Sequence, residues 1–188
     1  MEKLIIYATT YQHLYKQPIY GIFHTACGCI VGQQVAFNIG RNIRKQLYEI
    51  CGYPLTRDKV LKADLSSIKY LTPERKSLLL KLANIDDVRP ISDVLNDYSA
   101  LKGFGPWTYG AVSILTGISN TINLYTDSYI RKNLCIYTNS KMTIKNCNNY
   151  ITNAGENQTG ICYLLWIIKP NSVEKIRQGA ILTTSDFV

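Results

Sequence analysis

A turn with two glycines and a proline in eight residues restricts most strongly what this chain can fold into. It occupies residues 101–108, which read LKGFGPWT. Glycine reaches positive φ and permits close backbone approach, so Gly103 and Gly105 predict a tight turn. Pro106 fixes φ at the first position of a following helix, where no N–H partner is needed. The apolar side chains within the turn would hold the two helices together.

The same turn has a chemical consequence. It presents backbone N–H groups at the N-terminus of a helix, and a phosphate fits such a site. An ordinary connection between two helices would explain the glycines equally well. The turn alone therefore does not identify a phosphate site.

Apolar residues recur at helical spacing along most of the chain, which predicts an all-α fold. Between Ile30 and Leu47 they repeat every four residues, as in one amphipathic helix. Thr72 is a suitable N-cap for a helix, and Ser92 could cap another that runs to Leu95. Residues 146–157 are rich in Asn and are expected to form a loop or a weak helix. The remaining predicted elements are helices around 59–62 and over 73–83, 107–115, 127–137 and 160–168, and a short helix or ribbon within 171–188.

Composition limits the class of protein. The net charge of +8 favours a polyanionic partner, of which nucleic acid is the commonest, although a merely soluble basic protein has the same balance. The 46% of apolar residues exceeds what a disordered chain carries. The six cysteines contain no C-x-x-C pair, and with two histidines they complete no zinc spacing. We expect reduced, mostly buried cysteines in an intracellular protein that is not secreted and has no membrane span.

Asp127 is the first candidate for chemistry. It lies at the expected start of a helix, where it could serve only as an N-cap, as Thr126 also could. In the alternative interpretation the carboxylate lies beside a bound nucleotide. Breaking an N-glycosidic bond builds positive charge on the sugar, which a nearby carboxylate stabilises while it orients or deprotonates water. An enzyme that acts on a base must also extrude that base from the duplex.

These residues together resemble the helix-hairpin-helix DNA glycosylase superfamily. The family's Leu-x-Gly-x-Gly-x-x-Thr hairpin and its catalytic Asp match Leu101, Gly103, Gly105, Thr108 and Asp127. Three further segments resemble the 3-methyladenine DNA glycosylase II branch: 30–36 (IVGQQVA), 71–83, and 163–166 (YLLW). The matches extend from about residue 22 to residue 168, which is most of the chain.

The resemblance implies an all-α architecture with two helical lobes, a helix-hairpin-helix motif and an active-site cleft between the lobes. The whole of 1–188 would then be one domain. Its middle lobe would cover about 24–118, and its second lobe about 1–23 together with 119–188.

The resemblance also gives individual residues a role. Asp127 would be the catalytic carboxylate, and Gln34 would enter the gap left by the flipped base, unless it is simply a polar residue at a helix end. A monovalent cation could bind the hairpin carbonyls of Leu101 and Gly103, and no other metal is expected. The expected DNA contacts are Gly103, Gly105, Trp107, Thr108, Gln34, Lys102 and Arg131.

One position of the hairpin decides the chemistry. Trp107 stands two residues after Gly105, where bifunctional relatives carry a nucleophilic Lys. The resemblance therefore implies attack by water and an abasic product, without lyase activity. Alkylated-base members often have aromatic side chains where this chain has Ala111 and 157–159 (NQT). The base pocket could instead use Trp107, Tyr125, Phe37 and Tyr109, although aromatics at helical spacing are also common in cores.

The leading interpretation is a monofunctional glycosylase that flips a damaged base, such as the alkylated purine 3-methyladenine, out of DNA for base excision repair. The alternatives are a glycosylase for an oxidised, deaminated or otherwise modified base, a catalytically degenerate protein that binds DNA through the hairpin, and an unrelated helical DNA-binding module. We expect no cofactor, and no iron–sulfur cluster because only Cys147 and Cys162 lie near the C-terminus. The expected partner is double-stranded DNA with a damaged base, bound by a monomer wherever the genome is, in nucleus or cytoplasm.

Overall fold

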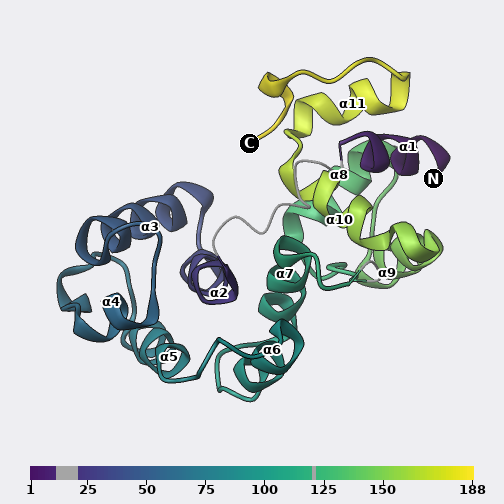
Figure 1. Ribbon diagram of the computed structural model, residues 1–188. Coiled ribbons are helices and arrows are strands. Elements are labelled where there is room, and N and C mark those ends of the chain that lie inside the picture. The colour runs from purple at the N-terminus through teal and green to yellow at the C-terminus, as the bar shows by residue number, and fades with distance from the viewer. Residues whose placement is uncertain (12–20, 120–121) are drawn as a thin grey trace. The chain divides into compact units, whose positions relative to one another are not determined.

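The computed structural model describes residues 1–11, 21–119 and 122–188, and their regular structure is almost entirely helical (Figure 1). Within those ranges the only β pairing is a single antiparallel bridge between Ile168 and Phe187. The prediction of an all-α fold is therefore confirmed. None of the helices described is long and apolar enough to span a bilayer.

The chain divides into two compact units, Pro18–Ile118 and Met1–Gln17 with Ser119–Val188. The first, here called the hairpin unit, contains the turn of 101–108. The second, here called the carboxylate unit, contains Asp127. Each has its own buried apolar core.

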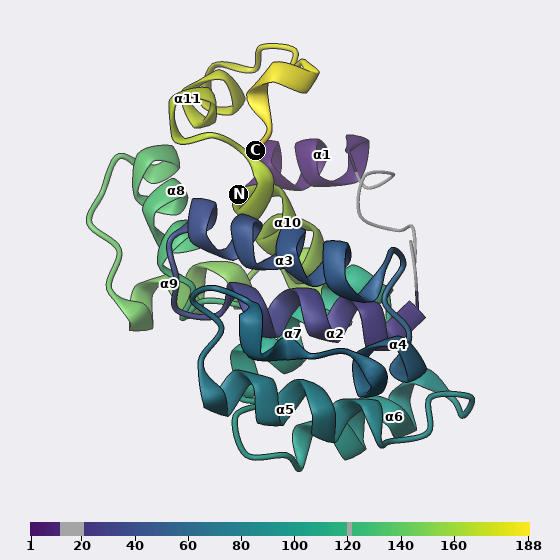
Figure 2. The same cartoon turned by 90° about the vertical axis from the view of Figure 1, so that its left-hand side faces the viewer.

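The hairpin unit is built around α2, which packs against α3, α5, α6 and α7 (Figures 1 and 2). The buried side chains of α2 include Phe23, Ala26, Ile30 and Val31. This is why the helix reads as apolar on several faces rather than along one stripe. The helices of this unit are α2 (Gly21–Gly32), α3 (Phe37–Cys51), α4 (Arg57–Lys62), α5 (Pro73–Ala83), α6 (Ile91–Ser99) and α7 (Pro106–Thr116), with a short 3-10 turn at Leu65–Ser67.

The four-residue repeat from Ile30 to Leu47 does not form one helix, so that prediction is wrong. Gln34 has a φ of +50°, so the helical conformation is broken between α2 and α3. The interruption folds α3 back onto α2, where a Cβ on Gly40 would lie only 3.3 Å from the Cα of Gly32. The repeated apolar residues belong to the buried faces of two helices that pack together. The spacing of these residues alone would fit one longer helix equally well.

Of the two N-caps predicted for α5 and α6, one is formed in the structure. The Thr72 hydroxyl accepts a hydrogen bond from Arg75 N, so the predicted cap of α5 is confirmed. Ser92 does not cap α6, which begins at Ile91 directly after Pro90. The Ser92 hydroxyl bonds to the Asp93 carboxylate instead, at 3.4 Å.

The carboxylate unit is built around α10, whose Ile161, Cys162, Leu164 and Leu165 are buried. It packs against α1, α8 and α9. The Asn-rich segment 146–157, expected to be a loop or a weak helix, forms most of α9 and then a 3-10 turn, and Cys147 and Ile151 bury one face of α9. The helices of this unit are α1 (Glu2–Thr10), α8 (Ser128–Thr138), α9 (Ile144–Thr152), α10 (Gln158–Ile167) and α11 (Pro170–Gln178), with 3-10 turns at Gly155–Asn157 and Thr184–Asp186.

A buried carboxylate fixes the C-terminal segment of this unit. Asp186 is 2% exposed and accepts hydrogen bonds from the Ser172 hydroxyl at 2.6 Å and the Lys175 ammonium at 2.7 Å. Its second oxygen accepts from Thr183 N at 2.8 Å. These donors, Lys175 first, hold the pKa of Asp186 far below its usual range. The network is fully paired, so its role is structural.

Candidate functional site

The hairpin consists of α6, the turn of residues 100–105 and α7. Gly103 has a φ of +101°, and a Cβ there would lie 3.2 Å from Leu78 Cδ2. Gly105 differs from the sequence prediction, because its φ of −80° is open to any residue. Nothing lies within 4 Å of where its Cβ would be. The fold thus requires glycine at position 103. At Gly105 no protein atom fills the space, so an atom of a ligand could lie there.

The N-terminus of α7 provides the anion-binding geometry that the sequence predicted. Pro106 occupies the first helical position and has no N–H. The N–H groups of Trp107 and Thr108 therefore lie at the positive end of the helix dipole. The open side of Gly105 leaves space for a phosphate beside this helix end.

The side chains of the hairpin divide by burial. Lys102 is exposed, and Trp107 and Tyr109 are half-buried. Thr108 is only 1% exposed, so its side chain is not available to DNA, contrary to the contact expected from the sequence. Ala111 is completely buried.

Gln33, the residue after α2, supports the hairpin, a role that the sequence analysis missed. Its side-chain Nε2 donates to the carbonyl of Gly103 at 3.2 Å and also to the Thr108 hydroxyl. The Arg75 guanidinium donates in turn to the carbonyl of Gln33. The Gly-Gln-Gln segment carried the signal, but only its second Gln was assigned a role.

These bonds bear on the predicted cation site. The carbonyl of Gly103 accepts from Gln33, and the carbonyl of Leu101 accepts from Phe104 N at 3.0 Å. A carbonyl oxygen has two lone pairs, so one on each remains for a cation. Elsewhere in the described part of the chain, no three His, Cys, Asp or Glu side chains cluster as metal ligands.

The turn between α2 and α3 projects two residues to solvent next to the hairpin. Gln34 is exposed and holds a positive φ, which costs a residue with a side chain on the order of 1 kcal/mol. Phe37 begins α3 and is 64% exposed. Because the adjacent Gln33 contacts Gly103, these side chains lie at the hairpin end of the unit.

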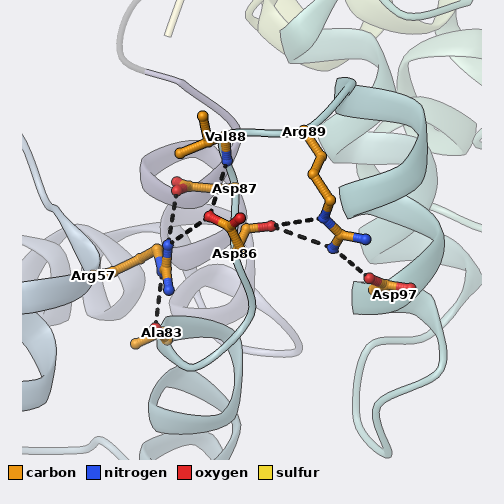
Figure 3. Close-up of polar contacts among 7 residues, drawn as sticks. All are labelled: Arg57, Ala83, Asp86, Asp87, Val88, Arg89 and Asp97. Carbon is orange, nitrogen blue, oxygen red and sulfur yellow. Dashed lines mark hydrogen bonds and ion pairs between the residues drawn. The ribbon is translucent and has the colours of Figure 1, made fainter.

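Two arginines hold the loop that leads into α6 (Figure 3). Arg57 donates to the carbonyl of Ala83 at 3.0 Å and to the Asp86 carboxylate at 3.1 Å. Arg89 bonds to the carbonyl of Asp86 and pairs with Asp97 on α6 at 2.5 Å. The start of the hairpin's first helix is therefore fixed by charged contacts.

In the carboxylate unit, Asp127 is the N-cap of α8, as its sequence position predicted. Its Oδ1 accepts from Tyr129 N at 2.8 Å and from Ile130 N at 3.0 Å. Both bonds are accepted by Oδ1. The cap therefore orients the carboxylate.

The segment before Asp127 is fixed to α9 and α10. The Thr159 hydroxyl accepts from Ile122 N at 2.9 Å, and Cys162 Sγ accepts from Leu124 N at 3.3 Å. Asn123 donates from its side chain to Asn148 at 2.9 Å. These contacts hold the backbone that leads to the carboxylate. Thr159 therefore has a structural role.

The helix that starts at Asp127 is anchored at its next turn. Asn133 is completely buried and donates to the carbonyls of Leu165 and Ile168 at 2.8 and 2.9 Å. Arg131 is half-buried, and its Nε is buried without a hydrogen-bond partner among the described residues. Any DNA contact from Arg131 must therefore use the outer part of its guanidinium. Tyr125, a candidate for the base pocket, is half-buried in the same unit.

The fold is that of DNA glycosylases. The 3-methyladenine DNA glycosylase from Archaeoglobus fulgidus matches with a TM-score of 0.64 at 16% identity, covering 86% of this chain. The chain spans 60% of the length of that protein. The DNA-3-methyladenine glycosidase from Bacillus halodurans matches with a TM-score of 0.60 at 14% identity, covering 85% of this chain and 79% of its own. No protein-family model and no curated sequence matches the chain.

Proposed function

We propose that this chain is a monofunctional DNA glycosylase of the helix-hairpin-helix superfamily, acting on a damaged base in double-stranded DNA. The observation that carries the proposal is the Asp127 carboxylate, which the backbone N–H groups of Tyr129 and Ile130 hold in a fixed orientation. It occurs in a chain with the fold of DNA glycosylases. The same chain has a hairpin suited to phosphate.

In the first step the hairpin holds the DNA backbone. A phosphate lies against the open side of Gly105 and accepts hydrogen bonds from the N–H groups of α7. The exposed Lys102 adds a positive charge. These contacts carry no sequence information and fix the position of the protein on the duplex.

In the second step the damaged nucleotide leaves the stack, and Gln34 enters the gap. Its exposure and its left-handed backbone support this role, because strained conformations persist where the surrounding structure imposes them and often serve a function. Extrusion costs a few kcal/mol and is easiest for a damaged base.

In the third step the bond between the sugar C1′ and the base nitrogen breaks, and the base leaves with the bonding pair. Asp127 stabilises the positive charge that develops on the sugar. Water forms the new C1′–O bond and passes its proton to the carboxylate. A cationic alkylated purine leaves as a neutral base, so no further proton is required.

Water is the nucleophile in this proposal because Trp107 occupies the position of the lysine in bifunctional relatives. The substrate proposed first is an alkylated purine such as 3-methyladenine, the base named in both structural neighbours. A second candidate is another modified base. The buried Ala111 favours it, because this position offers no ring for stacking on an electron-poor base.

The test is incubation of the protein with duplexes that each contain one alkylated, oxidised or deaminated base, followed by alkali to cleave abasic sites. We expect strand cleavage only after alkali and no covalent adduct with borohydride. Cleavage before alkali, or a trapped adduct, would contradict the monofunctional mechanism. Absence of cleavage across the panel, with duplex binding intact, would favour a DNA-binding protein without catalysis.

A further inference from the structure

An open groove lies along one face of α3, outside the hairpin. Its volume is about 690 Å³, and the described residues that line it are Asn38, Arg41, Asn42, Arg44, Lys45, Tyr48 and Glu49. Three of the seven side chains are cationic and one is anionic. The described lining of the groove therefore carries a net positive charge. The opposite face of the same helix is apolar.

The two faces of α3 have separate roles. Ile43, Leu47 and Cys51 are buried, and this face packs against α2. Arg41 and Lys45, one helical turn apart, are exposed (Figure 2 shows the helix along its length). Packing against α2 explains why the first face is apolar. It does not explain why the exposed face carries several cationic side chains.

Arg44 lies at the junction of the two faces and is half-buried. Its Nη1 would lie 3.4 Å from a Cβ on Gly32, at the end of α2. Among the described residues, neither Arg41 nor Arg44 has a carboxylate within ion-pair distance. Lys45 and Glu49 are 3.8 Å apart but largely exposed, so their pairing contributes little.

The helix that carries the groove follows the hairpin contact closely in sequence. α3 follows Gln34, and the preceding Gln33 bonds to Gly103 in the hairpin. From Asn38 to Glu49 the helix rises about 16 Å, which is the axial spacing of about five phosphates on one DNA strand. Guanidinium, ammonium and amide groups all donate to phosphate oxygens.

We infer that the α3 groove is a second DNA-backbone site, which binds phosphates flanking the nucleotide held by the hairpin. This inference rests on the proposed function for its choice of duplex DNA as the ligand. Arg41 and Lys45 each neutralise a phosphate, and Arg44 donates from the wall of the groove. Among the described lining residues, Glu49 is the one anionic group, and it opposes binding.

The test compares two double variants of equal net charge. Arg41→Ala with Lys45→Ala removes two charges from the groove. Lys62→Ala with Lys81→Ala removes two exposed charges from the ends of α4 and α5. Affinity for an undamaged 20-base-pair duplex is measured by fluorescence anisotropy between about 50 and 200 mM salt, the range over which phosphate contacts change affinity most.

We expect the groove variant to reduce the slope of log K against log salt by about 1.8, since each lost phosphate contact removes about 0.9. The control should retain the slope of the unmodified protein. Glu49→Gln should tighten binding, whereas Asp58→Asn on α4 should leave it unchanged. Equal slopes for the groove and control variants would overturn the inference, as would a neutral effect of Glu49→Gln.

Base release, measured separately, distinguishes this inference from the proposed function. If Asp127→Asn abolishes release but the groove variant binds with an unchanged slope, only the α3 site is rejected. If no base is released from any duplex but the groove variant loses slope, the α3 site stands and the proposed catalysis is rejected.

Discussion

The side-chain amide of Gln33 donates a hydrogen bond to the carbonyl of Gly103 at 3.2 Å, which joins the end of α2 to the turn of the hairpin. The same amide bonds to the hydroxyl of Thr108, which is 1% exposed. One side chain thus holds both the turn and the first turn of α7. The conformation of the proposed phosphate site therefore depends on a residue distant in sequence.

Replacing Gln33 by Ala should destabilise the protein by about 1–3 kcal/mol, because a buried hydroxyl loses its partner. Urea denaturation measures this loss, and duplex affinity should fall as well. Gln34→Asn is the matched control, since Asn tolerates the left-handed conformation and the exposed Gln34 supports no buried group. Equal stability of the two variants would argue against the support role.

The two hairpin glycines should respond differently to alanine. Gly103→Ala places a Cβ at a φ of +101° and 3.2 Å from Leu78, so it should destabilise the protein by about 1 kcal/mol or more. Gly105→Ala meets no protein atom, so it should lower the melting temperature less than Gly103→Ala, by no more than the cost of alanine at the N-cap of α7.

Gly105→Ala should nevertheless weaken DNA binding, because its methyl group fills the space proposed for a phosphate. Calorimetry and anisotropy on the same preparations separate the two effects. Normal DNA affinity in Gly105→Ala would show that no phosphate approaches this position.

Gln34 should contribute to binding of damaged duplex more than of single strands. Gln34→Asn keeps the backbone conformation and shortens the side chain, so it should no longer fill the gap left by a flipped base. We expect weaker binding to duplex containing an abasic-site analogue and unchanged binding to the single strand. A similar loss on both ligands would assign Gln34 to backbone contact.

His24 should make the hairpin unit sensitive to acid. Its Nδ1 accepts a hydrogen bond from Leu55 N at 3.1 Å, and its ring stacks on Tyr48. Burial lowers the pKa of His24, so below about pH 6.5 the unfolded chain binds more protons than the folded one. The stabilisation is complete above that pH and is lost as pH falls from it toward the lowered pKa.

The unmodified protein is compared with His24→Gln, whose side-chain oxygen can still accept a hydrogen bond but does not titrate. The difference in unfolding free energy between the two proteins should change between pH 7 and pH 5, measured by denaturation at each pH. A difference that does not change with pH would mean that His24 has the same pKa in the folded and the unfolded protein.

The sequence predicted the parts of the site that depend on neighbouring residues. Pro106 and the left-handed Gly117 bound α7 within one residue of expectation at each end, and Asp127 caps α8. These signals act over a single turn of chain.

The parts that depend on distant contacts were not predicted. The break before α3 reflects the approach of Gly40 to Gly32, and α9 forms because Cys147 and Ile151 are buried. The bond from Gln33 to Gly103 joins segments 70 residues apart. No local pattern encodes such pairs, since each depends on how helices pack.

The central claim is that Asp127 performs the cleavage. Asn is as good an N-cap as Asp, so Asp127→Asn should fold normally and bind duplex with unchanged or higher affinity. Single-turnover base release from the duplex cleaved best by the unmodified protein should fall by at least about 100-fold, the scale for loss of one electrostatic group at a reacting centre. Release at the unmodified rate by a folded, DNA-binding Asp127→Asn protein would contradict the account.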